Sequence, residues 1–299
     1  MNILVTGGCG YIGMSLCLRL QMRGHKVRAV DWSKLVFPKL PFEFYRADAW
    51  RLGDKDAAWP DAVIHLAGYS LAECEKDWAA TRRNNIELTA HLVKEFPEAR
   101  FVFASTCSVY GVMPRGEKAT TRTPPNPKGP YAESKLEAET YVAAHANAVI
   151  LRFGTVMGYA PVMRFDTLIN GAAQAVYRDD KITIYSPDSW RPFLALSSAV
   201  NALVIASVLE RDISPGIYNV VSTNIQKSRV GELVKAAGGK IEETTGGDVR
   251  DYAVELLEEG SPFYKALPPR AESWESLCFG QILTDLAEDE REILCPSLQ

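Results

Sequence analysis

The stretch ILVTGGCGYIG, residues 3–13, decides the fold of this 299-residue chain. Its apolar start predicts a short strand, and the glycines that follow at three-residue spacing predict a tight turn into a helix. Such a turn lets the backbone approach a pyrophosphate, whose charge the helix N-terminus stabilises. The sequence therefore predicts a bound dinucleotide. The residues expected beside it are Gly7, Gly10, Tyr11, Ile12 and Gly13.

An acidic residue follows the second predicted strand and bears on which dinucleotide is bound. The first helix is expected from Tyr11 to Arg23, and Lys26 to Val30 reads as the next strand, with Asp31 at its end. A carboxylate there accepts both ribose hydroxyls of adenosine and repels a 2′-phosphate, which favours NAD over NADP. The alternative stays open, because Lys34 beside Ser33 offers a site for a phosphate.

Composition narrows the class of protein. With 47% hydrophobic and 23% charged residues the chain is expected to be globular, with a large apolar core. Its net charge of −4 gives no basic field for nucleic acid, so an anionic substrate would have to be held by local arginines. The six cysteines show neither metal-type pairing nor a small-domain disulfide framework, which predicts a reduced, cytoplasmic setting without a metal site.

No membrane segment or signal peptide is predicted. The first residues lack a basic stretch and already read as a strand. Pro192 to Leu209 is the one long uncharged stretch, but serines and an asparagine interrupt it. A strand followed by a buried helix is the expected structure there.

Strand-like runs alternate with helical segments along the first half of the chain. This order predicts an α/β fold, a Rossmann-like doubly wound parallel sheet with a smaller C-terminal α/β substrate-binding cap. Further strands are expected at 43–46, 62–66, 100–104, 148–153, 182–185 and 217–220, and further helices at 78–96, 131–144, 165–177, 198–210, 227–237 and 271–286. Residues 1–155 form the expected NAD-binding domain, to which 182–210 partly return, and 156–299 form mainly the cap.

Tyr131 and Lys135 form the candidate catalytic pair. One helical turn separates them, so the phenol and the ammonium share a face. A phenol with a pKa near 10 is a poor base at neutral pH, but a neighbouring cation stabilises the phenolate. The spacing therefore predicts a tyrosine usable for proton transfer at a carbinol.

Several short motifs follow one another in the order typical of extended short-chain dehydrogenases/reductases. They are the glycine turn, Asp31, HLAG at 65–68, STCSVYG at 105–111, YAESK at 131–135 and WRPF at 190–193. The chain most resembles the NAD-dependent epimerase/dehydratase family, which acts on nucleotide-diphosphate sugars. The resemblance extends from Met1 to about Tyr252 and ends before the C-terminal segment, which departs from the family pattern.

This resemblance implies roles for individual residues. Tyr131 matches the catalytic acid/base, Lys135 the residue that lowers its pKa and binds the nicotinamide ribose, and Thr106 the group that hydrogen-bonds the reacting hydroxyl or ketone. Further cofactor contacts are implied for Asp48, Ala49, Leu66, Ala67, Gly68, Asn85 and Phe153. His65 lines this cleft without exchanging a proton. Substrate contacts are implied for Thr155, Arg191 and Arg250. The two arginines would contact the diphosphate.

The family also implies a homodimer built on the helices at 78–96 and 131–144, whose outward faces would offer Leu88, Leu92, Leu136 and Tyr141. Hydride removal from the sugar as Tyr131 takes the proton gives a 4-keto intermediate. A 4-epimerase needs no further group and is the favoured function. A 4,6-dehydratase is disfavoured, since Cys107-Ser108 stands where dehydratases carry Asp-Glu. A 4-ketoreductase remains the alternative, and a non-catalytic dinucleotide sensor is least favoured.

Overall fold

A seven-stranded parallel sheet forms the centre of the molecule. The computed structural model describes residues 1–33, 39–53, 56, 58–208, 213–256, 261, 263–264 and 274–288. The strand order is β11-β7-β5-β4-β1-β2-β3. The strands are β1 Asn2–Thr6, β2 Lys26–Asp31, β3 Glu43–Arg46, β4 Ala62–His65, β5 Arg100–Thr106, β7 Ala148–Phe153 and β11 Gly216–Val220. This confirms the predicted doubly wound sheet.

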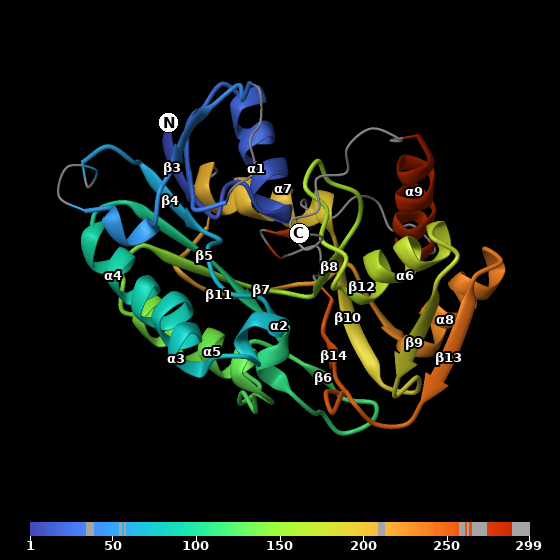
Figure 1. The fold of residues 1–299 in the computed structure, drawn as a ribbon. Helices are drawn as coiled ribbons and strands as arrows, with labels where there is room; N and C mark the ends of the chain where they lie inside the picture. The colour runs from blue at the N-terminus through green and yellow to red at the C-terminus, as the bar shows by residue number, and fades with distance from the viewer. Residues whose placement is uncertain are drawn as a thin grey trace.

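Helices cover both faces of this sheet (Figure 1). On one face lie α1 (Tyr11–Met22) and α7 (Leu196–Val208), which contact each other. On the other lie α4 (Leu88–Glu95) and α5 (Pro130–Ala143), preceded by the short α2 (Leu71–Cys74) and α3 (Trp78–Thr81). The central strands are sandwiched between apolar helix faces, which is why β4 and β7 are buried along their whole length, whereas the edge strand β3 is mostly exposed.

The cap is built from small sheets and three helices on the right of Figure 1. Its sheets are β12-β10-β8, β13-β9 and β14-β6. The elements are β6 Lys118–Ala119, β8 Thr155–Met157, β9 Lys181–Tyr185, β10 Trp190–Ala195, β12 Thr223–Gln226, β13 Lys240–Thr244, β14 Ala253–Val254, α6 Leu168–Tyr177, α8 Lys227–Ala236 and α9 Trp274–Glu288. One hydrophobic core runs from α1 and the sheet into these cap elements, so the cap is packed firmly against the sheet.

The stretch Pro192 to Leu209 was the one membrane candidate in the sequence. Its residues up to Val208 form most of β10 and the buried helix α7, as predicted, and Leu209 lies outside the described residues. None of the helices described here combines the length and the apolar character that crossing a bilayer requires.

The predicted division of the chain needs one correction. Residues 182–185 lie in β9 and pair with β13 within the cap, so this part does not return to the sheet. The returning part is α7 followed by β11, which pairs in parallel with β7 as the last strand of the main sheet. The prediction placed 217–220 in the cap. Chain order suggested that assignment, because nothing in a five-residue strand identifies its distant partner.

The predicted helix at 78–96 is present as one continuous helical segment, Trp78–Glu95, but with a π-helical stretch inside it. The chain forms α3, then a π-helical turn at Arg82–Glu87, and only then α4. A π turn adds a residue and so shifts the faces of the helix that follows. Leu88 and Leu92, predicted to face outward, are buried in the core instead, whereas Tyr141 on α5 is 41% exposed.

Candidate active site

The glycine turn leaves room for a phosphate group and none for side chains. A Cβ on Gly7, whose φ is +72°, would lie 2.7 Å from the Ala67 nitrogen, and one on Gly13 would lie 2.1 Å from the Gly7 oxygen. At Gly10 a Cβ would meet only the Gly7 oxygen, at 3.3 Å. Gly10 is also the N-cap of α1, so the first-turn amides of that helix face this space. The turn therefore fits the pyrophosphate of a dinucleotide.

Asp31 lies beside this turn at the end of β2. Its carboxylate accepts hydrogen bonds from the Cys9 amide (3.0 Å) and the Ser33 amide (2.9 Å), which hold it at the edge of the cradle. A carboxylate in this position suits the ribose hydroxyls of adenosine. Lys34, the residue weighed for a 2′-phosphate, lies outside the described residues.

Two residues predicted to contact the cofactor use their side chains elsewhere. The Tyr11 hydroxyl donates to the Gly158 carbonyl (2.5 Å) in the cap, so only its backbone amide is directed to the cradle. Asp48 accepts from the Trp50 amide (3.1 Å) and caps a short 3-10 helix that begins with the buried Ala49. No sequence signal marked either role, because the Tyr11 contact joins residues far apart in the chain and the Asp48 contact depends on a short turn.

The predicted catalytic residues come together where β5, β7 and α5 meet. Thr106 ends β5 and lies beside Phe153, its partner in the β5–β7 register. Tyr131 stands in the first turn of α5, after Pro130 at the start of the helix, and Thr106 hydrogen-bonds its phenol. The hydroxyls of Thr106 and Tyr131 thus lie next to each other at the end of β5.

Lys135 lies one turn further along α5 and is buried. Its Nζ donates to the Ala104 carbonyl (3.0 Å), and burial lowers its pKa to about 8. A Cβ on Gly68, the last residue of the HLAG motif, would lie 3.7 Å from this Nζ. The ammonium is therefore at the surface of the cleft that Leu66, Ala67 and Gly68 line.

Asn85 lies in the π-helical turn and connects the two sides of the cleft. Its Oδ1 accepts from the Tyr69 amide (2.6 Å), and its Nδ2 donates to the Ser134 hydroxyl (3.0 Å), next to Lys135. Asn85 thereby fixes the loop after β4 to the catalytic helix. π turns occur often at functional sites, and here the turn brings the asparagine into contact with both segments.

The groups that shift the pKa of Tyr131 are not the ones that the sequence predicted. Burial raises its pKa, and the influences that oppose this rise are, in order, the Arg164 charge, the hydrogen bond from Thr106 and the Arg250 charge. Lys135 was expected to lower the pKa of Tyr131. Its amine instead points to the Ala104 carbonyl, and the strongest opposing cation comes from the cap.

His65 is buried beneath the cleft as a neutral group. The Thr89 hydroxyl donates to the Asn85 carbonyl (2.7 Å), so His65 Nε2 donates to Thr89 (3.0 Å) and Nδ1 accepts from Thr6 (2.7 Å). Burial, together with the Lys135 charge, lowers the pKa of His65 to about 3. It was not predicted to be catalytic, and this environment is that of a structural residue.

This histidine gives a prediction for stability. An unfolded histidine takes up a proton below about pH 6.5, whereas folded His65 does so only near pH 3. The unfolded state therefore binds more protons between these values, and stability falls as the pH falls. We expect His65 to contribute a loss of about 2 kcal/mol between pH 7 and pH 5. Urea unfolding at both pH values should show this loss in the wild type and not in His65→Gln; parallel behaviour of the two proteins would contradict it.

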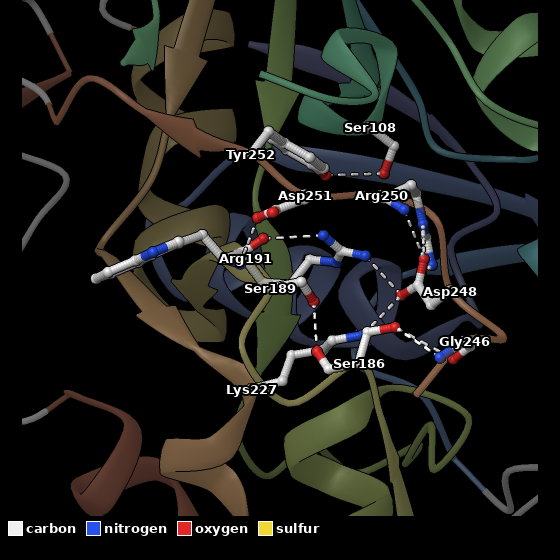
Figure 2. A network of polar contacts seen from close by, with 11 residues as sticks. Ser108, Ser186, Ser189, Arg191, Lys227, Gly246, Asp248, Arg250, Asp251 and Tyr252 are labelled. Atoms are coloured by element: carbon white, nitrogen blue, oxygen red, sulfur yellow. Dashed lines mark hydrogen bonds and ion pairs between the residues drawn. The ribbon is translucent and has the colours of Figure 1, made fainter. Parts of the chain in front are cut away.

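A cluster of cations in the cap shares one carboxylate (Figure 2). Asp248 Oδ2 lies 2.6 Å from Arg191 Nη2 and 3.4 Å from Lys227 Nζ, and its Oδ1 lies 2.9 Å from Arg250 Nε. Burial opposes ionisation of Asp248, but Arg250 and Arg191 hold its pKa well below the ordinary value. The nearby Asp251 accepts from the Trp190 amide (2.8 Å). Cations outnumber carboxylates within this cluster, so it suits an anionic ligand.

The structure brings Arg191 and Arg250 together as the resemblance implied. Arg191 is 4% exposed and comes from β10, and Arg250 comes from the segment before β14. Thr155 begins β8, beside Phe193 in the β8–β10 register. Lys227, at the start of α8, was not predicted, because no local pattern signals that it joins residues 191 and 248.

A second group missed in the sequence lies directly below the catalytic residues. Glu139 and Arg152 form an ion pair (2.6 Å) with both side chains 4% exposed. Ser105 donates to Glu139 (2.5 Å), and Arg152 donates to Tyr110 (2.9 Å). Glu139 continues the spacing of Tyr131 and Lys135 by one more turn, a signal that could have identified it.

The two residues after Thr106 are engaged in structural contacts. The Cys107 thiol donates to the Arg152 carbonyl (3.2 Å), and burial raises its pKa. The Ser108 hydroxyl hydrogen-bonds the Tyr252 hydroxyl (3.1 Å). Neither residue is arranged as an additional acid or base.

Known proteins are similar to this chain in sequence and in structure. The family model for the NAD dependent epimerase/dehydratase family matches residues 3–220. A UDP-glucose 4-epimerase of Lactobacillus helveticus is 29% identical over 69% of this chain and 72% of its own length. A GDP-6-deoxy-D-mannose reductase of Pseudomonas aeruginosa is 27% identical over 78% of each chain. Other curated relatives match over 39% to 58% of their length. The solved structure of MoeE5 with UDP-glucose and NAD is 24% identical, with a TM-score of 0.82 over 97% of this chain and 100% of that one, and so shares the fold.

Proposed function

Because the chain belongs to the NAD dependent epimerase/dehydratase family, we propose that it is a 4-epimerase of a nucleotide-diphosphate sugar. The family consists of NAD-dependent enzymes, so a non-catalytic sensor is not proposed. One observation carries the proposal. Thr106 hydrogen-bonds Tyr131 at the end of β5, and the two residues that follow Thr106 supply no second acid/base pair.

The residues have distinct tasks in this reaction. Thr106 hydrogen-bonds the sugar hydroxyl and orients it toward Tyr131, which takes its proton as the carbonyl forms. Tyr131 returns the proton to the carbonyl oxygen after the sugar has turned its other face for hydride delivery at C4. Lys135, with a pKa near 8, stays largely protonated at neutral pH and supplies a donor beside the cofactor ribose. Asn85 holds the loop after β4 in place. NAD, when bound at the glycine turn, would supply the hydride acceptor and donor for C4.

Arg191, Arg250 and Lys227 are proposed to bind the diphosphate of the substrate. Guanidinium groups match paired phosphate oxygens, and the cluster has more cations than carboxylates, which suits a negatively charged ligand. The Lactobacillus helveticus relative is named for UDP-glucose, which makes UDP-glucose the first substrate to test.

The competing functions make different demands. A dehydratase needs further proton transfer at C5 and C6, and the buried Cys107, bonded to the Arg152 carbonyl, offers none. A ketoreductase would use the same residues as an epimerase, and the Pseudomonas aeruginosa relative named as a reductase keeps this alternative in view. It differs in consuming one reduced cofactor per turnover.

The assay follows from this difference. Purified protein incubated with UDP-glucose and no added nucleotide is expected to form the C4 epimer, with no solvent deuterium at C5, because epimerisation at C4 exchanges no carbon-bound proton. Mass spectrometry of the product in deuterated water measures both results. Label at C5 would indicate dehydration chemistry. Product formation that needs stoichiometric NADH and a keto sugar would establish the reductase instead.

The protein is further proposed to be a cytoplasmic homodimer. The free thiols among the described residues, Cys9, Cys17, Cys74, Cys107 and Cys278, support a reducing compartment. The dimer proposal now depends on Tyr141 of α5 and Trp78 of α3, which are 41% and 43% exposed, since Leu88 and Leu92 face the core. Light scattering would measure the oligomeric state.

A further inference from the structure

Two aromatic residues meet at the carboxyl edge of the main sheet. The rings of Trp32 and Tyr69 have centroids 5.9 Å apart, with a 45° angle between their planes. Trp32 is the first residue after β2, and Tyr69 follows shortly after β4. No motif recognised in the sequence includes this pair.

The strand order places the pair across the glycine turn. In the sheet, β1 lies between β4 and β2, and the glycine turn begins where β1 ends. The strands β2 and β4 are therefore about 10 Å apart, two strand spacings, a gap that the two aromatic side chains close. Residues close to each ring already contact the turn: Asp31 accepts from the Cys9 amide, and Gly7 packs against Ala67.

The surrounding structure holds Tyr69 and Trp32 differently. The backbone of Tyr69 is fixed by Asn85, which accepts from its amide (2.6 Å) and donates to its carbonyl (3.4 Å). Asn85 is in turn bonded to Ser134 on the catalytic helix. Trp32, by contrast, is 53% exposed. One ring thus has a fixed base, and the other is free to rotate into solvent.

We propose that Trp32 and Tyr69 form an aromatic strap that lies over the bound dinucleotide at the glycine turn and slows its release. Paired aromatic faces exclude water, which strengthens the contacts between a pyrophosphate and the helix amides beneath it. An epimerase has to keep the cofactor between taking and returning the hydride, whereas a reductase has to exchange it at every turnover. The strap therefore favours the epimerase. The inference rests on the use of NAD in the proposed function and not on the identity of the sugar.

The test is the rate of NADH release. The full-length protein is loaded with NADH and mixed with excess NAD, and the change in NADH fluorescence gives the dissociation rate. We expect Trp32→Ala and Tyr69→Ala each to release NADH about tenfold faster, a change of about 1.4 kcal/mol. The double variant should be no faster than either single one, because removal of one ring already opens the strap.

Two control variants make this result specific. Trp32→Phe keeps a flat ring and should release NADH at close to the wild-type rate. Tyr177→Ala removes an aromatic side chain that is 46% exposed at the end of α6 and should change the rate by less than about twofold. Since Trp32 is exposed, its variants should fold, which thermal melting verifies, and Trp32→Ala alone suffices if Tyr69→Ala does not fold.

Unchanged release from Trp32→Ala, or effects of the two single variants that simply add, would overturn the strap. These outcomes are independent of the sugar assay. A wild type that interconverts sugars while Trp32→Ala releases NADH normally would leave the epimerase standing and remove the strap. Faster NADH release from Trp32→Ala, with no epimerase activity in the wild type, would support the strap and remove the epimerase.

Discussion

Tyr131→Phe is expected to lower kcat about a thousandfold, within the range that a positioned general acid/base contributes. The phenol and the Thr106 hydroxyl face one point, and removal of the phenol oxygen leaves the sugar hydroxyl without a proton acceptor there. Since this interaction acts in the transition state, kcat and kcat/KM should fall together. Steady-state kinetics with the nucleotide sugar identified in the epimerisation assay would measure both constants.

The same helix provides a matched control. Tyr141 lies on α5 and is 41% exposed, so Tyr141→Phe makes the same change away from the cleft. Its kcat should stay within about twofold of the wild type. A Tyr131→Phe variant that keeps more than a tenth of the wild-type kcat would remove this residue from the chemistry and with it the proposed mechanism.

Loss of the buried ion pair should have the largest effect on stability. Breaking such a pair by removing one partner costs about 3–5 kcal/mol, because it leaves an uncompensated buried charge. We expect this loss in Glu139→Leu, where the Arg152 guanidinium would remain buried without its carboxylate. Against a total stability of about 5–15 kcal/mol for a typical protein, this is a large fraction. Urea unfolding followed by circular dichroism measures it.

Two further variants identify the cause. Glu139→Leu/Arg152→Leu removes both charges and should recover part of the loss, since apolar replacements of buried pairs are often tolerated. Glu133→Gln changes an exposed glutamate on the same helix and should shift stability by less than about 0.5 kcal/mol. A Glu139→Leu variant that loses less than about 1 kcal/mol would show that the pair is not essential to the fold.

Elements with strong local signals were predicted well from the sequence. The strands at 43–46 and 148–153 have the predicted bounds, and α1 follows the glycine turn, because periodicity and glycine spacing are properties of short stretches. The residues that meet around Tyr131 were predicted through ordered motifs. That meeting is now visible in the β5–β7 register and in the first turn of α5.

The features that the sequence analysis missed or predicted wrongly depend on more than short stretches of sequence. No composition signal marks the π turn at 82–87, and Leu88 and Leu92 lie in the buried core instead of facing outward. The influence of Arg164 on Tyr131 and the convergence of Lys227 with Arg191 depend on how the cap packs over the sheet. Such contacts join residues far apart in the chain, and helical or strand periodicity does not encode them.

The path of the chain also has a consequence for synthesis on the ribosome. The sheet lacks its edge strand β11 and one covering helix, α7, until residue 220 has left the exit tunnel, although most of its other strands emerge far earlier. During that interval the nascent chain exposes the open edge of β7 and the apolar sheet face that α7 later covers. Unpaired edges and uncovered apolar faces are the surfaces on which unfinished chains aggregate, so chaperone demand should be highest while residues 156–220 are being translated.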